Sequence, residues 1–258
     1  MVSGCGRETM LRVIDDPELD GAWNMAVDQA LLQCADEGGQ VTLRFYRWAP
    51  ATLSLGYFQK ADDLKTHPLG FNCPVVRRAS GGGAILHDRE LTYSLCLPSH
   101  QRWATENERF YQMVHGAIIE FLASRKIVAE IHDAPTHETH HQAHSAPPFL
   151  CFERRTRGDV VIDAYKILGS AQRRQKKALL QHGSLLLESS PYTPHLPGIF
   201  DLTANRFPQA EIVEFLVSRI SSGLELPACP GLMSERERHL ARMIVAQRFG
   251  NDQWTYHR

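Results

Sequence analysis

Hydrophobic residues recur at helical spacing in four long segments of the chain and in short alternating or continuous runs between them. The helical spacing predicts helices over about 22–35, 106–124, 209–222 and 234–247. The short runs predict strands over about 11–14, 41–47, 51–57, 159–162, 166–172 and 183–187. Two more strands are expected on either side of a glycine-rich loop near residue 82, which anchors that loop at both ends.

The order of these elements favours an α+β fold. Strands and helices come in groups rather than in strict alternation, which argues against a doubly wound parallel sheet. With 258 residues, 43% of them hydrophobic and 22% charged, the chain is long enough to bury a full core. We predict a single domain over 1–258 whose C-terminal part, from about 205 to 258, is helical.

Composition and charge narrow the class of protein. The formal net charge of −1 gives no sign of a nucleic acid or an anionic membrane as a partner. No apolar run approaches the roughly 20 residues that span a bilayer, and the first ten residues lack the apolar segment of a signal peptide. The six cysteines form no Cys-x-x-Cys pair, which argues against a zinc knuckle or a redox dithiol. We therefore expect a cytoplasmic protein.

A histidine-rich segment over 132–148 raises the question of a metal site. It holds five of the 13 histidines, namely His132, His137, His140, His141 and His144. Two of these are adjacent and the others have no rigid support in the pattern, so a solvated loop is favoured and no metal is assigned. Its position just before Cys151 is compatible with an adapting segment.

The glycine-rich loop is the strongest local sign of a binding site. Gly81, Gly82 and Gly83 follow Arg77-Arg-Ala-Ser80 directly. Three consecutive glycines cost conformational entropy and indicate a positive φ or a ligand that lies against the main chain. We interpret this segment as a ligand-binding loop with positive charge beside it.

Cys151 is the candidate nucleophile among the cysteines. It follows a segment with two prolines and precedes Arg154, Arg155 and Arg157. A thiol with a pKa of about 8.5 is already a few per cent thiolate at pH 7, and nearby cations raise that fraction.

Two blocks of this sequence resemble the superfamily of biotin/lipoate protein ligases and octanoyltransferases. Residues 77–88 fit the pattern Arg-Arg-x-Ser/Thr-Gly-Gly-Gly-Ala-x-x-His-Asp, and residues 158–187 are similar to the Lys-Ile-x-Gly-Ser-Ala-Gln and Gln-His-Gly-Ser segments. Weaker similarities lie at 24–28, 43–59 and 252–255. The resemblance implies a central, largely antiparallel sheet flanked by helices, as in the catalytic domain of these ligases.

The dipeptide Cys151-Phe152 resembles one branch of the superfamily, the cysteine-dependent octanoyltransferases of the LipM type, which are related to the lipoate-protein ligase A family. That branch implies transfer of octanoyl from octanoyl-acyl carrier protein to the cysteine. The acyl group then passes to a lysine on the lipoyl domain of glycine cleavage H protein or of a 2-oxoacid dehydrogenase E2. No cofactor is implied on this route. The branch usually continues with Pro-Ser-x-Tyr-Glu-Leu, whereas this chain has Glu-Arg-Arg-Thr-Arg-Gly.

The resemblance also assigns residues. Lys166 is expected to act with Cys151 by polarising the thioester carbonyl. The residues expected to bind substrate are Arg77, Ser80, Gly81, Gly82, Gly83, His87, Gly169, Ser170, Ala171 and His182. His182 either accepts a proton from the incoming lysine amine, whose pKa is near 10.4, or is a buried core histidine. Arg173 and Arg174 either contact phosphopantetheine or an acidic carrier surface, or form a solvated edge.

Three other functions stay open on the sequence. An ATP-dependent lipoate-protein ligase would use Arg77, the glycines and Lys166 to hold an adenylate phosphate, with ATP and Mg²⁺ as cofactors. Amide-to-amide transfer of octanoyl is a second enzymatic alternative. A non-catalytic protein that binds an acyl group or lipoate would need the loop but neither Cys151 nor Lys166. The acyl-chain preference, the acceptor domain and the oligomeric state do not follow from the sequence.

Overall fold

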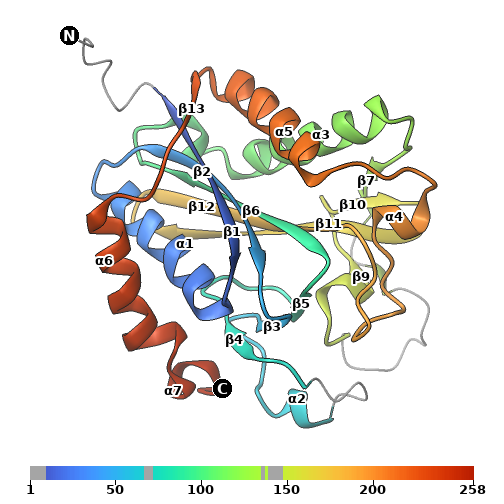
Figure 1. The fold of residues 1–258 in the computed structure, drawn as a ribbon, viewed down its shortest axis with the longest axis horizontal. Coiled ribbons are helices and arrows are strands. Elements are labelled where there is room, and N and C mark those ends of the chain that lie inside the picture. The colour runs from blue at the N-terminus through green and yellow to red at the C-terminus, as the bar shows by residue number, and fades with distance from the viewer. Residues whose placement is uncertain (1–9, 67–71, 135–136, 139–147) are drawn as a thin grey trace.

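An eight-stranded sheet forms the centre of the protein in the computed structural model, which describes residues 10–66, 72–134, 137–138 and 148–258 (Figure 1). Its strands lie in the order β13 (Ala228–Pro230), β1 (Leu11–Leu19), β2 (Val41–Trp48), β6 (Glu90–Leu97), β12 (Ala178–Leu186), β11 (Tyr165–Gln175), β10 (Val160–Ile162) and β7 (Glu130–Ile131). Strand β1 is parallel to both of its neighbours. Every other pair of neighbours in this sheet is antiparallel, which confirms the predicted sheet type.

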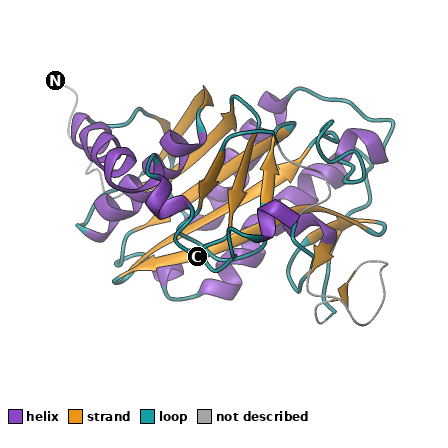
Figure 2. Cartoon of the chain, turned by 90° about the horizontal axis from the view of Figure 1, so that it is seen from below, coloured by secondary structure: helices purple, strands orange, loops and turns teal. Residues whose placement is uncertain are grey.

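Helices cover both faces of this sheet (Figures 1 and 2). Helices α3 (Asn107–Ser124) and α5 (Gln209–Leu224) lie together on one face, and α1 (Gly21–Asp36) and α6 (Glu235–Ile244) lie on the other. The remaining helical elements are α2 (Asp63–Thr66), α4 (Ile199–Leu202), α7 (Asp252–Thr255), 3-10 turns over Arg102–Ala104 and Cys151–Glu153, and a π-helical turn over Val245–Phe249. None of the helices in the described part of the chain has both the length and the apolarity needed to cross a bilayer.

A small second sheet carries the glycine-rich loop. Strand β3 (Thr52–Leu55) lies between β4 (Val75–Arg77) and β5 (Ile85–His87), and the loop connects β4 to β5. The two strands predicted at 41–47 and 51–57 therefore belong to different sheets. A further pair, β8 (His137–Glu138) and β9 (Arg154–Arg155), lies beside the segment that contains Cys151.

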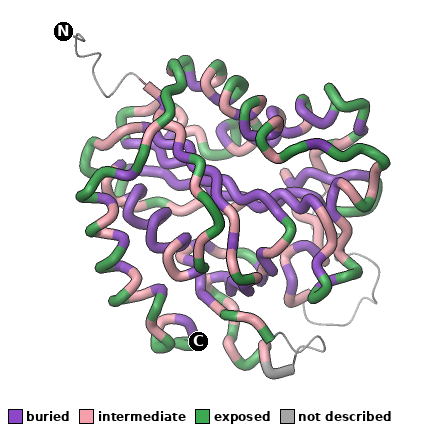
Figure 3. The backbone as a smooth tube through the Cα atoms, viewed as in Figure 1, coloured by how far each residue is buried: buried purple, intermediate pink, exposed green. Residues whose placement is uncertain are grey.

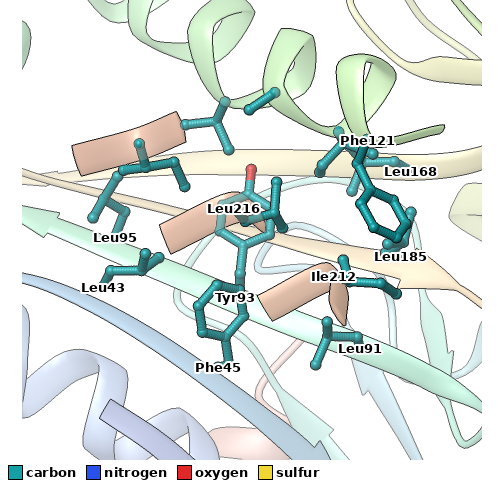
Figure 4. Close-up of a cluster of buried hydrophobic side chains, with 14 of the residues drawn as sticks. Leu43, Phe45, Leu91, Tyr93, Leu95, Phe121, Leu168, Leu185, Ile212 and Leu216 are labelled. Atoms are coloured by element: carbon teal, nitrogen blue, oxygen red, sulfur yellow. The ribbon is translucent and has the colours of Figure 1, made fainter. Parts of the chain in front are cut away.

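Strict alternation along β6 gives the two faces of the large sheet different chemistry. Leu91, Tyr93 and Leu95 pack against α3 and α5 in the main hydrophobic core, with Phe121, Ile212 and Leu216 (Figure 4). The intervening Glu90, Thr92 and Ser94 are equally buried, as are most residues of the central strands (Figure 3). Because successive residues of a strand point to opposite faces, these polar side chains lie on the α1 side. One face is thus apolar core, and the other can hold a polar site.

The C-terminal part is less uniformly helical than the sequence predicts. Helices α5 and α6 confirm the predicted segments, but β13 lies between them and pairs in parallel with the first residues of β1. The sequence missed this strand because Ala228-Cys-Pro230 has neither alternation nor a long apolar run. Its strand conformation depends on pairing with a distant segment rather than on local propensity.

Helix α1 is joined to the polar face of the sheet by a buried ion-pair network. The side chain of Arg44, on β2, has no exposed surface. Its Nη1 donates to Asp28 Oδ1 at 2.9 Å, its Nε to Asp16 Oδ2 at 2.7 Å and its Nη2 to Asn24 Oδ1 at 2.8 Å. These bonds compensate the cost of burying a guanidinium and a carboxylate.

The network yields a stability prediction. We expect Arg44→Leu to lower the free energy of unfolding by about 3–5 kcal/mol, because it leaves the Asp28 carboxylate buried without its cation. Urea denaturation measures this change. Arg109→Leu is the matched control, since Arg109 pairs with Glu106 on the surface and such pairs contribute about 0–1 kcal/mol. Equal losses in the two variants would contradict the role given to the buried pair.

Candidate active site

Cys151 is held beside the glycine-rich loop by main-chain contacts. Its backbone N–H donates to the carbonyl oxygen of Ala84 at 2.7 Å, and the N–H of Ala84 donates to the carbonyl oxygen of Phe149 at 3.0 Å. A Cβ atom on Gly83 would lie 3.0 Å from the backbone nitrogen of Cys151. Glycine at position 83 therefore allows the loop and the cysteine segment to pack closely.

The side chains of Cys151 and Lys166 meet, as the sequence expects. Lys166 Nζ lies 3.4 Å from Cys151 Sγ and 2.9 Å from Asp159 Oδ2. The Lys166 and Asp159 side chains are each only 2% exposed. A Cβ atom on Gly169 would lie 2.5 Å from Lys166 Cε, so the glycine at this position leaves the space that the lysine fills.

The charges in this group favour the thiolate. Burial by itself raises the pKa of the Cys151 thiol, but the positive charges of Lys166, Arg78 and Arg154 outweigh burial and the effect of Asp159, and the net shift is downward. Burial likewise tends to lower the pKa of Lys166, whereas Cys151 and Asp159 raise it above its ordinary value. The group can therefore present an anionic sulfur next to a fixed ammonium.

The glycine-rich loop has the backbone conformation that its sequence indicates. Gly82 has a φ of +96°, which side-chain-bearing residues rarely adopt. Arg78 supports the loop from inside, because its Nη2 donates to the carbonyl oxygen of Gly83 at 2.8 Å and its Nη1 to that of Ser54 at 2.7 Å. Burial lowers the pKa of Arg78 to about 10, still well above neutral pH.

The structure does not bring Arg77 to the site, contrary to the expectation from the sequence. Its guanidinium donates to the carbonyl oxygens of Thr255 at 2.8 Å, Gly56 at 2.9 Å and Gln59 at 2.7 Å. Residues 77 and 78 are neighbours at the end of β4, so their side chains point to opposite sides. Arg78 thus supplies the charge that was assigned to Arg77, and Arg77 ties α7 to the small sheet.

A pocket opens beside these groups. Its walls include the apolar side chains of Met25, Trp48 and Ile85. Eight of the predicted site residues also line it: Gly81, Gly82, His87, Cys151, Gly169, Ser170, Ala171 and His182. Its mixture of apolar walls with a few polar groups is typical of a small-molecule site.

His87 forms part of the cavity wall and is fixed on all sides. Its ring stacks on Trp48 with centroids 3.8 Å apart, its Nε2 lies 2.7 Å from Ser54 Oγ and its Nδ1 lies 3.3 Å from Glu90 Oε1. Burial lowers the pKa of His87 despite the nearby carboxylate of Glu90. The structure therefore places His87 as a rigid, neutral wall residue.

His182 belongs to another group of hydrogen-bonded polar side chains on the same face of the sheet. Its Nδ1 lies 3.4 Å from Asp28 Oδ2, and its Nε2 lies 2.6 Å from Ser80 Oγ. Burial tends to raise the pKa of Asp28, but the hydrogen bond with His182 and the charge of Arg44 lower it, so this carboxylate is ionised. An ionised Asp28 favours the tautomer with the proton on Nδ1, which leaves Nε2 as an acceptor. As an acceptor, Nε2 receives the hydrogen bond of the Ser80 hydroxyl, which links His182 to the glycine-rich loop.

Three residues that this geometry makes important received no site role from the sequence. Asp28 entered only as part of a weak similarity, although a carboxylate among the apolar positions of a helix is itself a signal of a buried polar site. Asp159 directly precedes an apolar strand, which is a similar signal. Arg78 was expected only to add positive charge beside the loop, because the substrate-binding role was assigned to Arg77. The side chains of His137, His140, His141 and His144 lie outside the described residues.

Comparisons with known proteins identify relatives of this chain and agree with its fold. The profile of the lipoyl protein ligase A/B catalytic domain matches residues 20–217. The chain is 32% identical to octanoyltransferase LipM of Brevibacillus brevis, over 96% of this chain and 99% of that protein. It is also 32% identical to octanoyltransferase LipM of Kyrpidia tusciae, over 95% of this chain and 98% of that protein.

Two solved structures have the same fold. One is a bipartite lipoate protein ligase from Thermoplasma acidophilum, described with its E2 lipoyl domain, with a TM-score of 0.72 and 20% identity over 96% of each chain. The other is lipoate-protein ligase A bound with ATP, with a TM-score of 0.71 and 22% identity over 96% of this chain and 98% of that one. The profile match and the relatives that align over nearly the whole chain show that this protein belongs to the lipoyl protein ligase A/B catalytic domain family.

Proposed function

We propose that this enzyme is an octanoyltransferase that moves octanoyl from octanoyl-acyl carrier protein to Cys151 and then to a lysine of a lipoyl domain. The observation that carries the proposal is the 3.4 Å contact between Cys151 Sγ and Lys166 Nζ beside a cavity with apolar walls. The names of the relatives that align over nearly the whole chain support the same reaction.

In the first step the Cys151 thiolate attacks the thioester carbonyl. A bond forms between Sγ and the acyl carbon, the bond to the pantetheine sulfur breaks, and that sulfur leaves as a thiolate. The ammonium of Lys166 stabilises the negative charge that develops on the carbonyl oxygen. One thioester replaces another, so the step needs little free energy from outside.

In the second step the amine of the acceptor lysine attacks the acyl group on Cys151. The amine must lose a proton, since a lysine with a pKa near 10.4 is almost fully protonated at pH 7. The Ser80 hydroxyl takes up this proton as it passes its own proton to His182 Nε2, and the Asp28 carboxylate stabilises the imidazolium that forms. An amide is made and the Cys151 thiolate is restored. The acceptors we propose are the lipoyl domains of glycine cleavage H protein or a 2-oxoacid dehydrogenase E2.

The ion-paired thiol favours this route over the ligase alternative. Activation as an adenylate gives a thiolate no part in the chemistry, whereas a thioester relay requires one. We therefore propose that the enzyme needs neither ATP nor Mg²⁺. The structures of ligases described above support the fold, and they do not bear on this choice.

The first prediction concerns the acyl intermediate. Incubation with octanoyl-acyl carrier protein without ATP should add one octanoyl group to the protein, as measured by intact mass, and Cys151→Ala should abolish the adduct. Cys229→Ala is the control, because Cys229 is exposed and its substitution should leave the adduct unchanged. An undiminished adduct in Cys151→Ala would place the nucleophile elsewhere. Octanoylation of a lipoyl domain that required ATP and free octanoate, without an adduct on the enzyme, would support the ligase.

A second prediction tests whether the positive charge of Lys166 stabilises the Cys151 thiolate. Lys166→Met removes the cation that lowers the pKa of Cys151, while burial continues to raise it. The inflection for alkylation of Cys151 by iodoacetamide should therefore move to higher pH, so the thiolate fraction at pH 7 falls. Single-turnover acylation at saturating donor should slow by about 10²-fold or more, as for the loss of an oxyanion donor. An unchanged inflection in Lys166→Met would show that this lysine does not stabilise the thiolate.

A third prediction separates the two steps. His182→Gln should acylate Cys151 at nearly the wild-type rate but transfer octanoyl to the lipoyl domain about 10²-fold more slowly or worse, because it lacks the proton acceptor. Rapid-quench mass analysis should show the acyl-enzyme accumulating. The exposed His239, substituted by glutamine, provides the control. If His182→Gln slowed acylation as much as transfer, the histidine would be a structural residue.

A further inference from the structure

Strand alternation separates the two arginines that follow the second family block. The side chain of Arg174 points toward α3 and donates to Asn107 Oδ1. The side chain of Arg173 points to the opposite face, where its Nη1 donates to the carbonyl oxygen of Ala79 at 2.6 Å. Ala79 directly precedes Ser80 and the glycine-rich loop. Arg173 therefore lies on the cavity side of β11, and Arg174 does not.

A second arginine, Arg248, lies close to Arg173. It comes from the π-helical turn near the C-terminus, and its guanidinium stacks on Trp254 at 3.7 Å from the ring centroid. Burial, together with the positive charge of Arg173, lowers the pKa of Arg248 to about 10. Two partly buried guanidinium groups that repel each other need a compensating anion.

The protein supplies no such anion within the described residues. Neither Arg173 nor Arg248 forms an ion pair there, and the buried Nε atom of each has no hydrogen-bond partner. The hydrogen-bond acceptors of these two side chains are neutral, namely the carbonyl oxygen of Ala79 and, at 3.4 Å from Arg248 Nη1, Gln29 Oε1. This pair contrasts with Arg44, whose buried charge is compensated by two carboxylates.

The position of Arg173 along β11 relates the two arginines to the reacting groups. Gly169 is in contact with Lys166, Ala171 lines the cavity, and Arg173 follows on the same face. At about 3.3 Å per residue, the backbone from position 169 to 173 spans about 13 Å. The arginine side chain extends this distance further. A pantetheine arm, which contains two amide units between its thioester and its phosphodiester, spans a comparable length.

We propose that Arg173 and Arg248 bind the phosphodiester of the phosphopantetheine arm that presents the octanoyl thioester to Cys151. Guanidinium groups suit this role because they form bidentate, charge-assisted hydrogen bonds with phosphate oxygens. The phosphate would supply the missing anion, and Arg173 would at the same time steady the main chain at Ala79. The proposal rests on the octanoyltransferase function and adds the group by which the donor is recognised.

The test compares octanoyl donors that differ only in the arm. Acylation of Cys151 is measured as kcat/KM with octanoyl-acyl carrier protein, octanoyl-coenzyme A, octanoyl-phosphopantetheine and octanoyl-pantetheine, the last of which lacks the phosphate. Arg173→Gln and Arg248→Gln should each lower kcat/KM at least about 10-fold for the three donors with a phosphate, since a charge-assisted hydrogen bond contributes about 1.5–3 kcal/mol. Octanoyl-pantetheine should react equally well with the wild type and both variants.

Controls make the outcome specific to the phosphate. Arg174→Gln, the neighbouring arginine on the other face, should leave every donor unaffected, and thermal unfolding checks that each variant is folded. Arg248→Lys keeps the positive charge, so it should retain more of the wild-type kcat/KM with the phosphate-bearing donors than Arg248→Gln does. A loss confined to octanoyl-acyl carrier protein would contradict the proposal and assign the arginines to the carrier's protein surface. Equal losses with all donors, octanoyl-pantetheine included, would also overturn it.

The same measurements distinguish failure of this inference from failure of the proposed function. If the wild type forms no acyl adduct with any donor, the octanoyltransferase function itself is wrong. If the wild type forms the adduct and both glutamine variants match it with every phosphate-bearing donor, only the arginine site is wrong.

Discussion

The Asp28 carboxylate is the group on which the polar half of the structure depends. Three side chains donate hydrogen bonds to it from two strands of the large sheet: Arg44 and Tyr46 on β2 and Ser94 on β6. His182, on β12, reaches it as well. A buried carboxylate is costly unless it is fully paired, so these partners must all be in place together. The same bonds that fix α1 on the sheet therefore also orient the histidine at the cavity.

A second buried group of charges organises the nucleophile. Asp159 fixes the ammonium of Lys166, and that ammonium lies against the sulfur of Cys151. The cysteine comes from a short turn, whereas the lysine and the aspartate come from the hairpin of β10 and β11. Contacts with the loop thus fix the position of the reactive sulfur, whereas charged side chains from the sheet set the pKa of the thiol. The lowered pKa of the thiol therefore depends on the folded protein.

The glycine-rich loop links these two groups. Ser80 contacts His182, Gly83 packs on the backbone of Cys151, and Arg78 holds the loop carbonyls from below. The two nucleophilic steps that we propose need the acyl carbon to be within reach of both the thiolate and the proton acceptor. A loop that contacts Cys151 and His182 at once satisfies this requirement without a large movement of either.

The sequence by itself determined the long helices and most of the strands. It also grouped the glycines, Cys151 and Lys166 in one site. Their spacing and the two long blocks constrain local conformation strongly, and the positive φ of Gly82 follows from such local constraint. The tertiary structure alone decided which of two adjacent arginines lies on the glycine-loop side of its strand, at 77 and 78 and again at 173 and 174. It also decided the partners of Asp28 and the existence of β13. These features depend on which face of a strand packs against a distant segment, and a one-residue change in register reverses that choice.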